Sequence, residues 1–352
     1  MSKTKIIPRK VLFDNPDIMA VRLSPNGAYI SWIAPKNGVL NIWIAPCADK
    51  EKATCLTHDT HRGIRTYFWA YDNKTILYVQ DHDGNENWNV YALDIITQEV
   101  KNLTNQQNVH AQIIAICEKY PAHIIVGLND RRPEFHDLYR LNIVTGEKEL
   151  VLCNDEYASF SVDNDMKVRF GAKITPDGGS EIYALTQDKP TLFCKIGMED
   201  LITTSLLCFS QDNTLLYMQD SRDRNTSALK EINLETGQSK ILAYDAQADM
   251  CDLLIHPQKK IPQAFASNYD RKRWIILDPE IDPHLDRLWE IAQGDVEITS
   301  RTQKDDLWIV AYLQDAGPVR YYLYDVLTEK AEYLFSSKAQ LEEQPLLPMH
   351  PV

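Results

Sequence analysis

The segment Asn41-Ile-Trp-Ile-Ala-Pro46 decides the fold, because versions of it recur along the whole chain. Each copy is a short apolar run with a large side chain near its middle, and each ends at a polar turn or at a proline. Seven copies end at residues 46, 94, 142, 186, 233, 278 and 325, so that successive ends lie 44 to 48 residues apart. A repeat of about 40 to 50 residues that contains four strands is typical of the blades of a β-propeller.

The copies agree better in spacing than in sequence. An aromatic residue stands three positions before the end of five copies, whereas Lys230 and Ile275 occupy that position in the other two. The six later copies are Asn89-Val-Tyr-Ala-Leu-Asp94, Asp137-Leu-Tyr-Arg-Leu-Asn142, Glu181-Ile-Tyr-Ala-Leu-Thr186, Ala228-Leu-Lys-Glu-Ile-Asn233, Arg273-Trp-Ile-Ile-Leu-Asp278 and Arg320-Tyr-Tyr-Leu-Tyr-Asp325. The spacing predicts an all-β fold, a seven-bladed β-propeller with four-stranded antiparallel blades, formed as a single domain by residues 1–352.

The blades should end near residues 60, 105, 153, 197, 244, 294 and 336. In the first repeat, Pro25-Asn26-Gly27 predicts a turn between the first two strands, because proline presets one φ angle and glycine accepts a positive φ. Later second strands are expected at Ile76–Val79, Ile124–Leu128, Val168–Ala172, Leu215–Met218, Ala264–Ala266 and Leu307–Leu313. Sealing of the repeat array should bring residues 20–24 close to residues 333–335. One helix, at residues 283–294, is expected to decorate the sixth repeat.

Composition excludes several classes of function. The 352 residues are 44% hydrophobic and carry a net charge of −13, which opposes binding to nucleic acid or to an anionic membrane surface. No apolar run resembles a signal peptide or a membrane-spanning helix, so the expected location is the cytoplasm. The seven cysteines have no paired spacing and are expected to be buried free thiols in a reducing compartment.

Motifs for chemistry are missing from the sequence. No Gly-x-Ser-x-Gly string is present, and Ser180 in Gly178-Gly-Ser180 should simply begin a strand. Zinc, nucleotide and other cofactor motifs are also absent, and the loop that begins at Asp81 lacks the twelfth-position glutamate of a calcium loop. We therefore expect no catalytic residue, no metal and no cofactor in this chain.

The loops between second and third strands carry most of the polar character. In an antiparallel blade these loops should emerge at the same edge as the connections between blades. Arginine suits carboxylate recognition at interfaces, because its planar guanidinium makes paired hydrogen bonds. The candidates for a substrate path or a docking surface are Arg131, Arg132, Arg222, Arg224 and Arg271. Ordinary solvation of turns is the competing explanation.

Several segments of the chain also carry a resemblance to a known family. They include Arg22-Leu-Ser-Pro-Asn-Gly27, Asp81-His-Asp-Gly-Asn-Glu-Asn-Trp88, Leu128-Asn-Asp-Arg131, Asp220-Ser-Arg-Asp-Arg224 and Gly317-Pro-Val-Arg-Tyr-Tyr-Leu-Tyr-Asp325. In order and spacing, along essentially the whole chain, they resemble the N-terminal β-propeller of bacterial S9-family serine peptidases. This group includes the prolyl oligopeptidases, acylaminoacyl-peptidases and dipeptidyl aminopeptidases.

The resemblance implies a substrate-gating domain. In the family an α/β-hydrolase domain follows the propeller and supplies the catalytic Ser, Asp and His, whereas the propeller excludes large folded substrates and admits peptides. The segment 337–352 resembles the linker to that hydrolase, so the expected partners are an α/β-hydrolase domain and peptide substrates. Two alternatives remain open: a standalone propeller that serves as a scaffold for protein or peptide binding, and an enzyme with chemistry in its central funnel.

Overall fold

The computed structural model describes residues 6–187 and 189–350. Its strands form seven separate antiparallel sheets, six of four strands and one of three. The chain is an all-β, seven-bladed β-propeller, which confirms the prediction from the repeat. It divides into two compact units. Unit 1 consists of the residues up to Tyr67, Asp270–Lys272 and the residues from Pro279 onward; unit 2 consists of Phe68–Tyr269 and Arg273–Asp278.

Unit 1 contains the first and the last sheet. The first consists of β1 (Met19–Leu23), β2 (Tyr29–Lys36), β3 (Val39–Pro46) and β4 (Thr54–Cys55), and the last of β24 (Asp295–Arg301), β25 (Leu307–Leu313), β26 (Arg320–Asp325) and β27 (Lys330–Ser336). Its short helices are α1 (Arg9–Phe13), η1 (Lys50–Lys52), α2 (Asp282–Ile291) and α3 (Ala339–Glu342).

The first and last sheets pack against each other through a shared apolar cluster. Val21 and Leu23 of β1 are buried with Ile309 of β25, and Leu334 and Phe335 of β27 lie against the same cluster. The Leu23 N–H also donates to Ser300 Oγ at 3.0 Å. This confirms that residues 20–24 come close to residues 333–335.

The expected helix is present as α2, and it packs on the last sheet. Pro283 lies in its first turn, where a missing N–H costs no hydrogen bond, and Leu285 and Leu288 are buried. The Tyr312 hydroxyl donates to the Leu288 carbonyl at 2.6 Å. The helix is therefore a packed part of unit 1.

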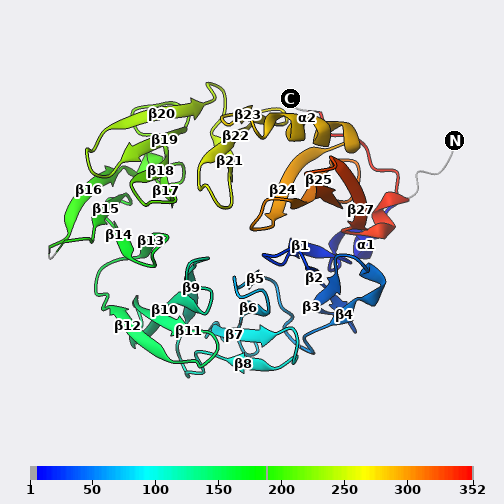
Figure 1. The fold of residues 1–352 in the computed structure, drawn as a ribbon, viewed down its shortest axis with the longest axis horizontal. Helices are drawn as coiled ribbons and strands as arrows, with labels where there is room; N and C mark the ends of the chain where they lie inside the picture. The colour runs from blue at the N-terminus through cyan, green and yellow to red at the C-terminus, as the bar shows by residue number, and fades with distance from the viewer. Residues whose placement is uncertain (1–5, 188, 351–352) are drawn as a thin grey trace. The chain divides into compact units, whose positions relative to one another are not determined.

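Unit 2 contains the five sheets between them, which follow one another in chain order (Figure 1). They consist of β5 (Tyr67–Trp69), β6 (Thr75–Gln80), β7 (Asn89–Asp94) and β8 (Val100–Asn102); β9 (Ala111–Ile116), β10 (His123–Arg132), β11 (Phe135–Asn142) and β12 (Lys148–Leu152); β13 (Ser159–Val162), β14 (Val168–Ile174), β15 (Ser180–Ala184) and β16 (Thr191–Ile196); β17 (Ser205–Phe209), β18 (Leu215–Asp220), β19 (Ala228–Asn233) and β20 (Ser239–Tyr244); and β21 (Met250–Ile255), β22 (Pro262–Asn268) and β23 (Lys272–Ile276). The short helix η2 (Met198–Asp200) lies between β16 and β17.

In five of the seven sheets the second strand has the largest number of buried residues, as its apolar run predicts. Ile124, Val126 and Leu128 of β10 have no exposed surface and pack in one cluster with Leu77 of β6 and Val90 of β7, so that adjacent sheets share a core. The outer strand β12 is exposed at its first four residues. Apolar burial between neighbouring sheets is the main stabilising contribution in this arrangement.

The turns between the first and second strands of six sheets share one backbone feature. We call the four strands of a sheet A to D in chain order. Strands alternate in direction, so A–B and C–D turns lie at one edge, and B–C loops and D–A connections at the other. In six A–B turns one residue has a positive φ; these residues are Gly27, Asn73, Met166, Asn213, Lys260 and Asp305. Glycine, asparagine and aspartate tolerate this conformation best.

Candidate functional site

The Arg131 guanidinium already forms hydrogen bonds with other residues of the chain. It lies at the B–C end of β10, where Nε and Nη2 donate to the Asp137 carboxylate at 2.7 and 2.9 Å. Nη1 donates to Asp155 at 2.8 Å, and Nη2 also donates to the Asn154 carbonyl at 2.8 Å. Arg131 holds the pKa of Asp137 below its ordinary value, aided by the Asn154 N–H. Arg131 therefore fastens a B–C loop to the next D–A connection.

Arg132 belongs to the same network. Its Nη1 donates to Asp155 at 2.9 Å, so that two guanidinium groups share one carboxylate. Its guanidinium carbon lies 5.9 Å from the centre of the Phe135 ring. Both arginines together lower the pKa of Asp155.

Arg222 is paired in the B–C loop after β18. Its Nε and Nη2 each donate to Asp220 at 2.8 Å, and Lys230 Nζ donates to the same carboxylate at 3.2 Å. Burial opposes ionisation of Asp220, but the bonds from Arg222 and Lys230 outweigh it and hold its pKa below the ordinary value. Two cations thus share one buried carboxylate, beside a cavity of about 450 Å³ that Cys194 also lines.

Arg224 is the most available of the four candidate arginines in unit 2. Its Nε donates to the Thr226 carbonyl at 3.2 Å, and its guanidinium lies 4.4 Å from the centre of the exposed Tyr244 ring. Its two Nη groups form no hydrogen bond with any residue that the structure describes. Arg224 can therefore bind an external carboxylate without breaking an internal pair.

Arg271 belongs to unit 1, where its Nε donates to Asp295 at 3.1 Å and Nη1 lies 3.9 Å from Asp315. The structure brings Arg131 and Arg132 together at Asp155, and it places Arg222 and Lys230 at the Asp220 carboxylate. That all five predicted arginines share one surface stays a prediction.

Exposed apolar side chains lie at the B–C and D–A edge of unit 2, and they were not predicted from the sequence. We call residues 174–179, 197–204 and 221–227 the unit 2 edge. Ile174, Met198 and Ile202 in it are 71%, 69% and 94% exposed. Ser221 Oγ donates to Asp200 at 2.7 Å, which ties the D–A connection to the loop of Arg222 and Arg224. Met198 and Ile202 in a short connection were the available signal.

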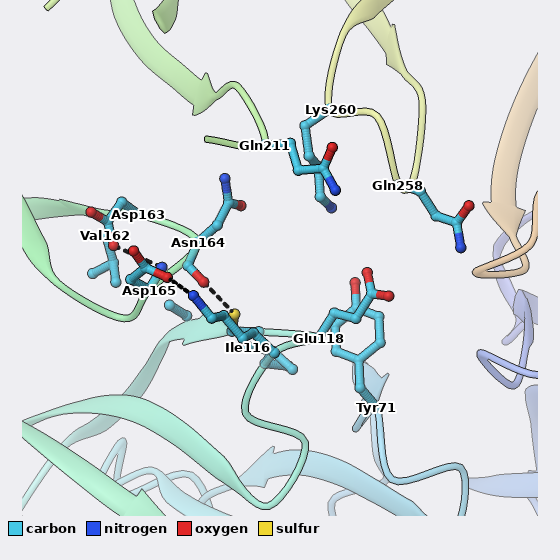
Figure 2. A pocket seen from close by; sticks show the side chains of 13 residues that line it. Tyr71, Ile116, Glu118, Val162, Asp163, Asn164, Asp165, Gln211, Gln258 and Lys260 are labelled. Carbon is cyan, nitrogen blue, oxygen red and sulfur yellow. Dashed lines mark hydrogen bonds and ion pairs between the residues drawn. The ribbon is translucent and has the colours of Figure 1, made fainter. Parts of the chain in front are cut away.

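A cavity of about 760 Å³ lies at the opposite edge of unit 2 (Figure 2). A–B turns of five successive sheets line it. The lining residues are Tyr71, Ala115, Ile116, Cys117, Glu118, Lys119, Val162, Asp163, Asn164, Asp165, Gln211, Gln258 and Lys260. Its size is within the range of small-molecule sites.

Hydrogen bonds join three of these turns. The Cys117 thiol donates to the Asn164 carbonyl at 3.0 Å, and the Asn164 N–H donates to Asn213 Oδ1 at 3.0 Å. Lys119 forms an ion pair with Asp165, which also accepts from Asn213 Nδ2 at 3.3 Å. The rim is therefore fixed on this side.

Other residues singled out in the sequence have structural roles. Ser180 begins β15, and its hydroxyl donates to the Lys173 carbonyl at 3.0 Å. Asp81 is buried and accepts the Glu86 N–H at 3.1 Å. Among the residues described, no group of three or more His, Cys, Asp or Glu side chains is arranged to hold a metal. Of the seven cysteines, Cys117 is buried and Cys153 and Cys251 are exposed, which corrects the expectation of general burial.

Known proteins resemble this chain in sequence along nearly its whole length. No family model matches the chain. Over 351 residues it is 38% identical to dipeptidyl aminopeptidase BIII of Pseudoxanthomonas mexicana, in a match that covers 99% of the chain and 51% of that protein. It is also 28% identical over 359 residues to dipeptidyl peptidase family member 6 of Caenorhabditis elegans, covering 97% of the chain and 48% of that protein. The chain is homologous to the propeller of S9-family serine peptidases. It spans about half the length of these curated relatives.

Solved structures agree on the fold of this S9-type propeller. A chain from a structural and mechanistic analysis of two prolyl endopeptidases matches 92% of it with a TM-score of 0.64 and 11% identity, over 50% of that chain. A puromycin-hydrolyzing peptidase of Mycobacterium tuberculosis matches 96% with a TM-score of 0.61 and 12% identity, over 56% of that chain. In the part of the S9-type propeller that the structure describes, none of the helices has the length and apolar character needed to cross a bilayer.

Proposed function

We propose that this S9-type propeller gates the access of peptides to a serine-peptidase domain of the α/β-hydrolase type. The observation that carries the proposal is the 38% identity to dipeptidyl aminopeptidase BIII along nearly the whole chain, which accounts for about half of that enzyme. In this role the propeller acts by size selection and exclusion of water, and it needs no proton-transfer group of its own.

The unit 2 edge supports a docking role within this proposal. Isoleucine and methionine side chains as exposed as Ile202 and Met198 gain about 1.5 to 3 kcal/mol each when a partner buries them. Arg224 lies in a B–C loop of the same edge, and its two Nη groups, which form no hydrogen bond with any described residue, can bind a carboxylate of the partner. Apolar contacts next to an arginine are typical of protein interfaces. The proposed occupant of this edge is the hydrolase domain.

A chimera tests the proposal. The chain is joined to the half of dipeptidyl aminopeptidase BIII that it does not span, and that half is also prepared alone. The measurement is kcat/KM for a dipeptidyl arylamide and for an unfolded polypeptide of at least 50 residues. The chimera should retain the arylamide activity and lose activity on the long chain relative to the hydrolase half alone.

The alternatives give different results in the same experiment. A scaffold would leave the ratio of the two kcat/KM values unchanged by the propeller. An enzyme with its own chemistry would show turnover by the purified chain without the hydrolase half. Either result would overturn the gating proposal.

A further inference from the structure

The cavity in Figure 2 contains two charged side chains that have no hydrogen-bond or ion-pair partner among the residues described. Lys119 is paired with Asp165, and Asp163 is paired with Arg169, so those charges are compensated inside the protein. The Glu118 carboxylate and the Lys260 ammonium lie in the same cavity, and neither forms a hydrogen bond or ion pair with any residue in the described part of the chain. Among the described residues that line the cavity, Glu118 and Lys260 therefore offer an anion and a cation to a ligand.

Neutral polar groups accompany the two charges. Figure 2 shows Gln211 and Lys260 reaching into the cavity from one side and Glu118 with Tyr71 from the other, while Gln258 borders it. Burial and the nearby Glu118 raise the pKa of Tyr71, so its hydroxyl stays neutral, and the hydroxyl oxygen can accept a hydrogen bond from an ammonium group. Amide side chains of glutamine both donate and accept, as peptide groups require.

The backbone at Lys260 indicates that its side chain is placed for a reason other than folding. Its φ is 52°, a conformation that corresponding A–B turns give to Gly27, Asn73 and Asn213. Met166 also has a positive φ, but it is 1% exposed and fills a core cluster. Lys260 is half-buried and lines the cavity, and its turn is closed by its own N–H, which donates to the His256 carbonyl at 3.0 Å. A strained non-glycine residue at the rim of a cavity is a common feature of binding sites.

We propose that this cavity binds a short zwitterionic peptide, with Glu118 and Tyr71 receiving its amino terminus, Lys260 its carboxylate, and Gln211 and Gln258 the peptide groups between them. The proposal rests on the proposed function for its choice of peptides as the ligand class. It adds a recognition site for free peptide ends, formed by the A–B turns at the edge opposite to the proposed docking edge. A peptide lacking either charge would leave one of the two side chains unpaired.

The test measures binding of trialanine to the chain by isothermal titration calorimetry, without any hydrolase. The matched ligands are N-acetyl-trialanine and trialanine amide, each of which removes one terminal charge. Each blocked peptide should bind about tenfold more weakly than trialanine or worse, because one charge-assisted hydrogen bond is lost.

Two variants assign the ends. Glu118→Gln should remove the penalty of N-acetylation and keep that of amidation, whereas Lys260→Gln should do the reverse. Glu99→Gln and Lys189→Gln, at exposed positions outside the cavity, are the controls and should leave all three affinities unchanged. Thermal unfolding of each variant verifies that it is folded.

Three outcomes would overturn the proposal. They are no saturable binding of trialanine, equal affinity for blocked and free peptides, and a loss of affinity on blocking that neither Glu118→Gln nor Lys260→Gln removes at its own end of the peptide. Because no peptidase is present, failure here is distinct from failure of the gating proposal, which is decided by the chimera's selectivity for substrate size.

Discussion

The guanidinium of Arg131 donates two hydrogen bonds, of 2.7 and 2.9 Å, to the carboxylate of Asp137. The two partners differ in exposure, since the Asp137 side chain is 3% exposed and that of Arg131 is 40% exposed. Asp137 also accepts the Asn154 N–H at 2.7 Å. The pair therefore holds a buried negative charge at the joint between the third and fourth blades.

Removing either partner should destabilise the protein, but for different reasons. Asp137→Asn loses charge-assisted bonds and should lower the free energy of unfolding by roughly 1 to 3 kcal/mol. Arg131→Gln should cost more than Asp137→Asn, because it leaves a buried carboxylate with few donors. Urea unfolding at pH 7 measures both; the reverse order would contradict this explanation of the joint.

The same pair predicts a dependence on acid. Arg131 lowers the pKa of Asp137, so the folded state binds fewer protons there than the unfolded state. Stability from this group is present above the ordinary aspartate pKa of about 3.9 and is lost as the pH falls through the lower folded value. Asp137→Asn should show a smaller loss of stability between pH 5 and pH 3 than the parent chain, measured by urea unfolding. Parallel curves would argue against an ionised Asp137.

Two A–B turns with the same backbone strain should respond in opposite ways to one substitution. Lys260→Asn should raise the free energy of unfolding by about 0.5 to 1 kcal/mol, because asparagine tolerates a positive φ better than lysine. Met166→Asn should lower it by about 2 to 4 kcal/mol, because a buried apolar side chain is lost from a core cluster. Denaturant unfolding of both variants checks this; loss of stability in Lys260→Asn would mean that Lys260 supports the fold.

The sequence predicts the strands well because the burial pattern is local. The apolar run Ile124–Leu128 lies within β10, and the repeat segment that ends at Pro46 is the end of β3. The sixth sheet was predicted less well, since it has three strands. Asp278-Pro279 follows β23 and α2 begins at Asp282, so the predicted helix leaves no room for the fourth strand that the repeat also predicted.

The candidate site was harder to predict, because its partners are distant in sequence. The loop position of Arg131 makes it a candidate for an interface, but its hydrogen bond to Asp155 joins two residues that are 24 positions apart in sequence. The cavity is lined by turns that span residues 71 to 260, and no local pattern brings them together. Residue type and loop position indicated possible contacts; the three-dimensional fold decides which arginines are already occupied.

Exposed Ile202 provides a test of the proposed docking edge. Ile202→Ser should leave the free energy of unfolding within about 0.5 kcal/mol of the parent, because the side chain is 94% exposed. It should weaken association with a separately prepared hydrolase half by about tenfold, through loss of apolar burial. Val144→Ser, at a C–D turn on the opposite edge, is the control and should bind as the parent does. Equal affinities for all three proteins would place the interface elsewhere.

His136 should make the stability of unit 2 sensitive to mild acid. It lies in the third blade with its ring 5.4 Å from that of His110, edge to face, and its Nε2 is buried and forms no hydrogen bond with another described residue. Burial, with a further contribution from His110, lowers the pKa of His136, and burial likewise lowers that of His110 despite the nearby Glu86. The folded state therefore binds fewer protons at these rings than the unfolded chain, where the histidine pKa is about 6.5. Stability should be complete above that pH and should fall as the pH decreases below it, because the unfolded state then takes up protons that the folded state resists. His136→Phe keeps a ring in the same space and removes one titrating group, so its free energy of unfolding should fall less between pH 7 and pH 5. The measurement is urea unfolding at several pH values; the same slope in parent and variant would show that His136 does not carry the effect.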